Sequence, residues 1–243
     1  MELDVLAIAA HRDDLELRAG GTLTKLADQG YRVGALDLTA GESGTGGDAA
    51  TREGEAAEAA RIMGLVHRSC LGLPDGALDS RDREALRSIV EAIREHRPSL
   101  VLTPWWVTRH PDHRETSLLV TDAVFYAGMK KFEATGEPHR PNDVYYFMMR
   151  YRFEPSVIVD VSDQFDRKQQ AVRAYASQFH HPDRKRDPGD ETFISSPEFL
   201  EEIWDTDRYF GRLVRASYGE PFLLRHPPEV DDPVRLAAGR TYF

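Results

Sequence analysis

The sequence is poor in cysteine and in long apolar runs, and each shortage excludes a class of protein or site. Cys70 is the only cysteine among 243 residues, so an intrachain disulfide and a cysteine-based zinc site are both excluded. It lies in a short apolar run and is expected to be a small, buried core residue. No apolar stretch approaches the length of a membrane span. The first ten residues lack the basic start of a signal peptide, and we expect a cytoplasmic protein.

Positive charge is also scarce relative to negative charge. The chain has 31 Lys and Arg against 41 Asp and Glu, which gives a formal net charge of −10. A nucleic-acid surface needs a basic stripe, and an anionic bilayer attracts basic residues, so neither partner is expected. The hydrophobic content of 41% and the charged content of 30% are ordinary for a globular protein that buries a core.

Apolar runs and helical periodicity alternate along the first half of the chain. The predicted strands cover residues 5–10, 33–39, 69–73 and 100–103, and the predicted helices cover 22–29, 51–63, 82–96 and 115–126. This alternation predicts an α/β fold with a mostly parallel, Rossmann-like sheet and helices on both faces. Ligands of such sheets bind at the carboxyl ends of the strands.

The second half has a weaker pattern and is expected to form a C-terminal extension of the same domain. The predicted strands here cover 143–150 and 156–161, and the predicted helices cover 163–179 and 198–216. We expect a flexible loop at 180–192 and a tail at 229–243. No linker divides the chain, so residues 1–243 are expected to form one domain.

Two polar clusters follow predicted strands, and their side chains are suited to a metal centre. The clusters are His11, Asp13 and Asp14 after the first strand, and His110, Asp112 and His113 after the fourth. A catalytic zinc site needs about three protein ligands with one position left open for water, and two imidazoles with one carboxylate are a common set. The remaining side chains can supply a base for the water, a partner for an oxyanion and an orienting carboxylate. A glycine-rich loop at 41–48 is expected to close over this site.

Each cluster alone is more typical of a capped loop or a surface arrangement than of a metal site. Two clusters at one edge of one sheet favour the metal centre. Two rivals from other classes stay open at this point. The same ligand types suit a non-haem Fe(II) redox enzyme, and the pocket could serve a non-catalytic sugar-binding protein.

The sequence around these clusters resembles the PIG-L/LmbE-like zinc deacetylases. The resemblance covers roughly residues 3–223. The motifs that carry it are A-H-R-D-D-L-E-L at 10–17, G-G-T at 20–22, T-A-G-E-S-G-T at 39–45 with Arg52 and Glu55, L-P-D-G at 73–76 and H-P-D-H at 110–113. Weaker similarity at 153–155, 177–179 and 209–211 points to the bacillithiol-biosynthesis deacetylase branch. The resemblance implies one LmbE-like domain that removes the acetyl group from an N-acetylglucosamine conjugate similar to N-acetylglucosaminyl malate.

The resemblance also implies roles for individual residues. His11, Asp14 and His113 match the ligands of Zn²⁺, with Fe²⁺ possible in the cell. Asp13 matches the general base, His110 the imidazole that stabilises the oxyanion or protonates the leaving amine, and Asp112 its orienting partner. Arg52 and Asp75 match positions that contact the sugar. Family members often self-associate, so a homo-oligomer is expected.

Two residues of the first metal motif, Arg12 and Leu15, depart from the family pattern, and the departure at Arg12 matters for the substrate. Arg12 stands where the family usually has proline, which would fix φ in this loop. Arginine adopts the same φ without strain, so the metal geometry need not change. Arg12 is expected to be a surface arginine paired with a neighbouring acid, or else to contact an anionic group of the substrate such as a malate carboxylate.

Overall fold

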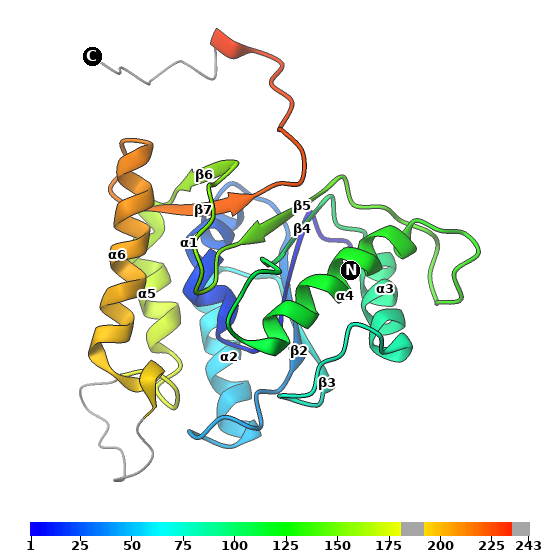
Figure 1. Ribbon diagram of the computed structural model, residues 1–243, viewed down its shortest axis with the longest axis horizontal. Helices are drawn as coiled ribbons and strands as arrows, with labels where there is room; N and C mark the ends of the chain where they lie inside the picture. Colours follow the sequence, from blue (N-terminus) through cyan, green and yellow to red (C-terminus); the bar gives the residue numbers. More distant parts are fainter. Residues whose placement is uncertain (181–191, 235–243) are drawn as a thin grey trace.

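A seven-stranded sheet forms the centre of the computed structural model, which describes residues 1–180 and 192–234 (Figure 1). The strand order is β3-β2-β1-β4-β5-β7-β6. The strands are β1 (Val5–Ala9), β2 (Val33–Thr39), β3 (His67–Leu73), β4 (Leu100–Pro104), β5 (Asp143–Phe147), β6 (Val157–Asp160) and β7 (Gly219–Leu223). Strands β1 to β5 are parallel, and β7 is antiparallel to both β5 and β6. The predicted mostly parallel sheet is confirmed.

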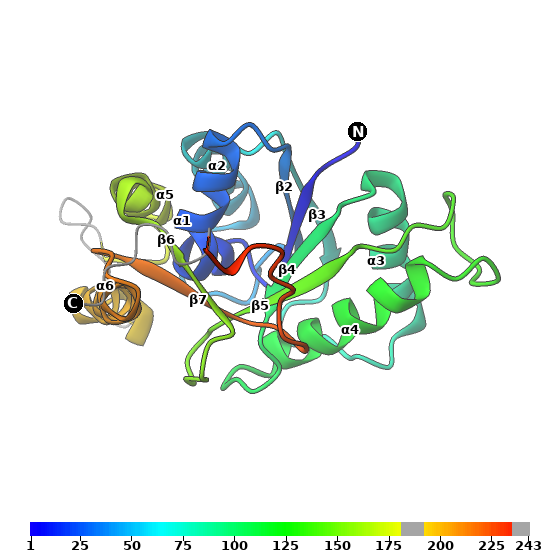
Figure 2. The same cartoon turned by 90° about the horizontal axis from the view of Figure 1, so that it is seen from above.

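Helices cover both faces of this sheet, as predicted. They are α1 (Asp14–Asp28), α2 (Ala49–Met63), α3 (Arg83–His96), α4 (Pro111–Ala127), α5 (Phe165–Arg173) and α6 (Pro197–Leu213). Seen from above, α3 and α4 lie on one side of the sheet, whereas α1, α2 and α5 lie on the other (Figure 2). Within the described residues, no helix has the length and apolar character that crossing a membrane requires.

Strand β1 is the centre of the core because it is buried on both faces. Val5, Ala7 and Ala9 pack with apolar residues of α1, whereas Leu6 and Ile8 pack with those of α3 and α4. Alternate side chains of a strand point to opposite faces, so a strand covered on both sides is apolar throughout. This explains the unbroken apolar run from which the strand was predicted.

Both metal-motif clusters lie at helix N-termini, where the sequence predicted loops. Helix α1 begins at Asp14 instead of residue 22, and α4 begins at Pro111 instead of residue 115. The first prediction was wrong because helical spacing was assigned only after Gly20-Gly21, whereas both glycines are buried within α1. A Cβ on Gly21 would lie 2.7 Å from Cβ of Val161, so glycine is required here by close packing.

The second half of the chain shows larger differences from the prediction. The helix expected at 163–179 ends at Arg173, and strand β7 was not predicted. The strand expected at 143–150 ends at Phe147. Cys70 is only partly buried, because β3 is an edge strand. Residues 181–191 and 235–243, which include most of the expected loop and part of the expected tail, lie outside the described residues.

Candidate metal centre and active site

The two predicted clusters meet at one edge of the sheet, at the carboxyl ends of the parallel strands. His11 follows β1, Asp75 follows β3, and His110 follows β4 by a short loop. Together with Asp13 and Asp14 they line one pocket of about 310 Å³. The expectation that residues far apart in sequence share this edge is confirmed.

Potential ligand atoms of three side chains converge in the pocket. Nδ1 of His11 lies 3.2 Å from Nε2 of His113 and 3.3 Å from Oδ2 of Asp14. Nε2 of His113 lies 3.1 Å from Oδ1 of Asp14. Ligands held about 2.0–2.1 Å from a tetrahedral zinc ion are about 3.3–3.4 Å apart, so these atoms are spaced closely enough to share one metal ion. The residue types also fit a borderline-soft divalent cation.

The charges of these side chains support the same interpretation. Burial alone would lower the pKa of His11, but Asp14 above all, with Asp112 and Asp75, raises it well above its usual value. Burial alone would raise the pKa of Asp14, yet His113 and His11 hold it well below its usual range. Carboxylates arranged to favour a positive charge at this point would also favour a metal cation.

The second ring nitrogen of His11 faces carboxylates. Nε2 lies 3.1 Å from Oδ1 of Asp75 and 3.5 Å from Oδ2 of Asp112. A carboxylate on the outer nitrogen of a ligating histidine fixes its tautomer and its ring orientation. Asp75 is itself held by the Ser43 backbone N–H, which donates to its Oδ2 at 2.9 Å. Asp75, expected to contact the sugar, therefore also orients His11.

Asp13 lies on the pocket wall beside the three ligand side chains. Its Oδ2 is 3.7 Å from Nη2 of Arg52. Burial raises the pKa of Asp13, whereas the Arg52 guanidinium acts in the opposite direction. A carboxylate in a desolvated position next to a bound water is suited to accept a proton.

His110 is the N-cap residue of α4. Its Nδ1 accepts a hydrogen bond from the backbone N–H of Asp112 at 3.2 Å, so neutral His110 carries its proton on Nε2. Its ring stacks on that of His113 at 4.8 Å and lines the pocket. Burial lowers the pKa of His110, and His113 and His11 lower it further.

The role expected for the Asp112 side chain needs a correction. Its Oδ2 accepts from the N–H of Gly76 at 2.7 Å, and its Oδ1 accepts from that of Leu78 at 3.3 Å. The carboxylate therefore faces His11 and the turn after β3, and it is the backbone of Asp112 that orients His110. The resemblance implied that the Asp112 side chain orients His110, but its carboxylate bonds to the turn after β3 instead.

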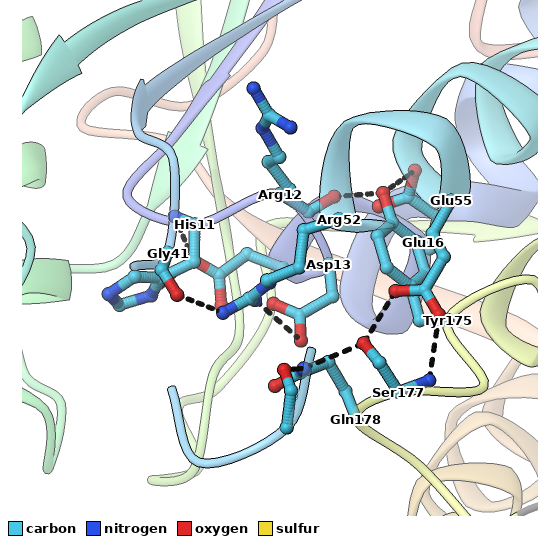
Figure 3. Close-up of polar contacts among 12 residues, drawn as sticks. His11, Arg12, Asp13, Glu16, Gly41, Arg52, Glu55, Tyr175, Ser177 and Gln178 are labelled. Atoms are coloured by element: carbon cyan, nitrogen blue, oxygen red, sulfur yellow. Dashed lines mark hydrogen bonds and ion pairs between the residues drawn. The ribbon is translucent and has the colours of Figure 1, made fainter. Parts of the chain in front are cut away.

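A buried network that the sequence did not reveal fixes the loop between His11 and Asp14. The carbonyl oxygen of Arg12 accepts a hydrogen bond from the hydroxyl of Tyr175 (Figure 3). It accepts a second one from Nη2 of Arg68. Arg68 also pairs with Glu16 and Asp37. Burial raises the pKa of Glu16 to about 7, with Arg68 opposing that effect. The acidic residue of the D-D-L-E motif thus helps to hold the metal loop from behind.

The glycine-rich loop borders the pocket, as expected. Ser43 and Gly44 line it, and the carbonyl oxygen of Gly41 accepts a hydrogen bond from Nη1 of Arg52. Glu55, the other motif residue of α2, accepts from both the backbone N–H and the hydroxyl of Ser177 (Figure 3). These bonds join the loop, α2 and the segment after α5, and they explain why the motif includes both side chains.

Arg12 differs from the expectation of a surface arginine. It is only 7% exposed, and its Nη1 donates to the carbonyl oxygen of Ala49 at 3.4 Å. Figure 3 shows its side chain turned away from Asp13 and Arg52. The sequence suggested three residues that contact the substrate. Arg52 and Asp75 line the pocket, whereas Arg12 is not among the described residues that line it.

The comparisons with known proteins identify relatives of this chain. The family model for PIG-L, GlcNAc-PI de-N-acetylase, matches residues 6–124. The diacetylchitobiose deacetylase of Thermococcus kodakarensis is 33% identical, over 89% of this chain and 80% of its own. The probable N-acetyl-α-D-glucosaminyl L-malate deacetylase 2 of Bacillus cereus is 31% identical, over 73% of this chain and 84% of its own.

A solved structure is similar over nearly the whole chain. A conserved protein of Thermus thermophilus superposes with a TM-score of 0.86 at 38% identity, covering 95% of this chain and 98% of that one. With the coverage of the curated relatives, this places the chain in one family throughout. It is an enzyme that belongs to the PIG-L family of de-N-acetylases.

Proposed function

We propose that this enzyme hydrolyses the acetamide of an N-acetylglucosamine conjugate at a metal centre held by His11, Asp14 and His113. The observation that carries the proposal is the convergence of three side chains, those of His11, Asp14 and His113, whose facing nitrogen and oxygen atoms lie 3.1–3.3 Å apart. Asp13 and His110 line the same pocket. The family relationship and the deacetylase relatives support the reaction class. A Zn²⁺ ion at this point would lower the pKa of a bound water toward neutrality and polarise the amide carbonyl.

The chain's own residues then complete the hydrolysis. Asp13 accepts a proton from the attacking water as the new carbon–oxygen bond forms. The Nε2–H of His110 donates a hydrogen bond to the reacting group, either to the oxygen that gains charge or to the departing nitrogen. The carbon–nitrogen bond breaks as the nitrogen takes a proton, either the one that Asp13 accepted from the water or one from Nε2 of His110. Acetate and the free amino sugar then leave. Arg52 and Asp75, both on the pocket wall, are proposed to contact the sugar.

The finer part of the proposal concerns the conjugate and the metal. We propose an aglycone of the malate type, as in bacillithiol biosynthesis, supported by the Bacillus cereus relative at 31% identity. The chitobiose deacetylase matches at 33%, so a disaccharide substrate is the direct competitor. We propose Zn²⁺ as the metal, Fe²⁺ being the alternative in the cell, and self-association of the chain. Metal analysis of the purified protein and light scattering test these two points.

The test of the function is acetate release from a panel of N-acetylglucosamine conjugates, with mass spectrometry of the amine product. The zinc-loaded wild-type protein should release acetate stoichiometrically with free amine. Asp13→Asn should keep its metal and lose at least about 100-fold in kcat, because general-base catalysis contributes about 10²–10⁴-fold. His113→Ala should lose the metal. Near-normal turnover by Asp13→Asn would overturn the base assignment, and an absence of acetate release across the panel would overturn the function.

A further inference from the structure

Three guanidinium groups gather at one end of the pocket, in a protein whose net charge is −10. Arg18 lies on α1, Arg109 directly precedes His110, and Arg150 follows β5, and all three line the pocket. Arg109 and Arg150 lie over the ring of Phe193, at 6.0 and 5.0 Å from its centroid. None of these positions has a part in the hydrolysis proposed above.

Arg18 differs from Arg52 and Arg150, which also line the pocket, in its partners. Arg52 is bonded to the Gly41 carbonyl and faces Asp13, and Arg150 is bonded to Glu202 at 2.6 Å. Among the described residues, no hydrogen bond or ion pair to the guanidinium of Arg18 is found. Burial lowers the pKa of Arg18 to about 10, although the more distant carboxylates of Asp207 and Glu202 act to raise it. A partly buried cation without a direct partner is costly, so a bound anion would stabilise this arrangement.

The position of Arg18 relates it to the reaction centre. It stands four residues after Asp14 on the same helix, so the two side chains lie on the same face, about 5–6 Å apart at Cβ. A substrate whose acetamide lies at Asp14 would therefore have its next substituents beside Arg18. The walls at this end include the apolar side chains of Met149, Phe193 and Phe199. A charge-assisted hydrogen bond is stronger against such walls than in water.

We propose that Arg18, assisted by Arg109, binds a carboxylate on the aglycone of the substrate. The proposal rests on the deacetylase function proposed above and adds the residue that selects an acidic aglycone. The sequence suggested Arg12 for a contact with an anionic group of the substrate. The proposal assigns that contact to Arg18, which lines the pocket. A neutral disaccharide would offer Arg18 no carboxylate.

The test compares two probes that differ only in charge. One is an N-acetylglucosaminide with a carboxylate on its aglycone, and the other is the methyl ester of the same compound. We expect the wild-type enzyme to prefer the acid at least tenfold in kcat/KM. In Arg18→Met, which keeps the apolar stem, this preference should fall close to one through a higher KM for the acid, with the ester unchanged. Arg152→Met removes an arginine outside the pocket lining and should keep the wild-type preference.

Calorimetric binding of the two probes separates this proposal from the proposed function. Tighter binding of the acid than of the ester by wild type, lost in Arg18→Met, supports the carboxylate site whether or not acetate is released. Equal binding of acid and ester by wild type overturns it even if both are hydrolysed, as does undetectable binding of the acid. An equal loss for both probes in Arg18→Met would show a general packing role and would also overturn it. Thermal unfolding of the variants checks that they remain folded.

Discussion

Nε2 of His11 lies 3.1 Å from Oδ1 of Asp75, while Nδ1 of the same ring faces Asp14 and His113. The two nitrogens of the His11 ring thus have different roles: Nε2 bonds to a carboxylate, and Nδ1 faces the other proposed ligands. With the proton held on Nε2 by the carboxylate, the lone pair of Nδ1 points to the place where the three ligand side chains converge.

Asp75→Asn should therefore weaken metal binding without removing a ligand. Loss of the carboxylate makes Nδ1 a poorer ligand and frees the ring to rotate, and such partners are typically worth about 10–100-fold in metal affinity. Competition with a chromophoric chelator measures the dissociation constant for Zn²⁺. Asp79→Asn, an exposed position in the same connection, should leave the affinity at the wild-type value. Equal affinities of wild type and Asp75→Asn would show that Asp75 has no orienting role.

Gly21→Ala and Gly54→Ala form a matched pair of substitutions within helices. A Cβ at Gly21 would lie 2.7 Å from Cβ of Val161, whereas nothing lies within 4 Å of one at Gly54. Overpacking of this kind costs about 1–3 kcal/mol, whereas alanine in an open helical position gains about 0.5–1 kcal/mol over glycine. Urea unfolding at saturating metal should show opposite signs for the two variants. If both variants are more stable than wild type, Gly21 is not under packing constraint.

The sequence allowed the parallel sheet and the meeting of the two clusters to be predicted, because both depend on local patterns. An unbroken apolar run predicted β1, and strand–helix alternation placed His11 and His113 at one edge. Local patterns could not place β7, which is short and joins the sheet from the far end of the chain. They also misplaced the start of α1, since Gly21 resembles a helix break unless its contact with Val161 is known.

The contacts that hold the loop between His11 and Asp14 could not be predicted from local patterns either. Arg68 lies near the start of β3, but the predicted strand began only at residue 69. Its bonds to the Arg12 carbonyl, Glu16 and Asp37 join residues that are far apart in the sequence. A single arginine in a sequence carries no signal of such contacts.

Arg68→Met should be strongly destabilising. It leaves the buried carboxylates of Glu16 and Asp37 without their cation, and removal of one partner from a buried pair costs about 3–5 kcal/mol. Arg61→Met is a suitable control because Arg61 makes an exposed pair with Glu58, which is worth at most about 1 kcal/mol. Chemical denaturation of both variants gives the comparison. A loss in Arg68→Met no greater than that in Arg61→Met would mean that the buried network adds nothing to stability.

A second buried cluster joins the C-terminal extension to the sheet. Nζ of Lys168 lies 2.6 Å from Asp207 on α6 and 2.7 Å from Glu220 on β7. Glu220 in turn accepts hydrogen bonds from the backbone N–H groups of residues 21 and 22. Burial raises the pKa of Asp207 to about 6; Glu220 adds to this effect, and Lys168 and Arg18 oppose it. Two carboxylates share one ammonium group here, so the folded state favours protonated Asp207.

The contribution of Asp207 to stability should therefore fall as the pH rises from about 4 to about 6. Its pKa in the unfolded chain is about 3.9, so within this window the folded protein binds more protons than the unfolded chain. Asp207→Asn keeps an oxygen for Lys168 but does not titrate, and its difference from wild type in unfolding free energy should change across this window and become constant above it. Asp205→Asn, exposed on the same helix, should differ from wild type by little at any of these pH values. Urea unfolding at intervals between pH 4 and 8 measures these differences, and a pH-independent difference for Asp207→Asn would show that Asp207 does not titrate in this range in the folded protein.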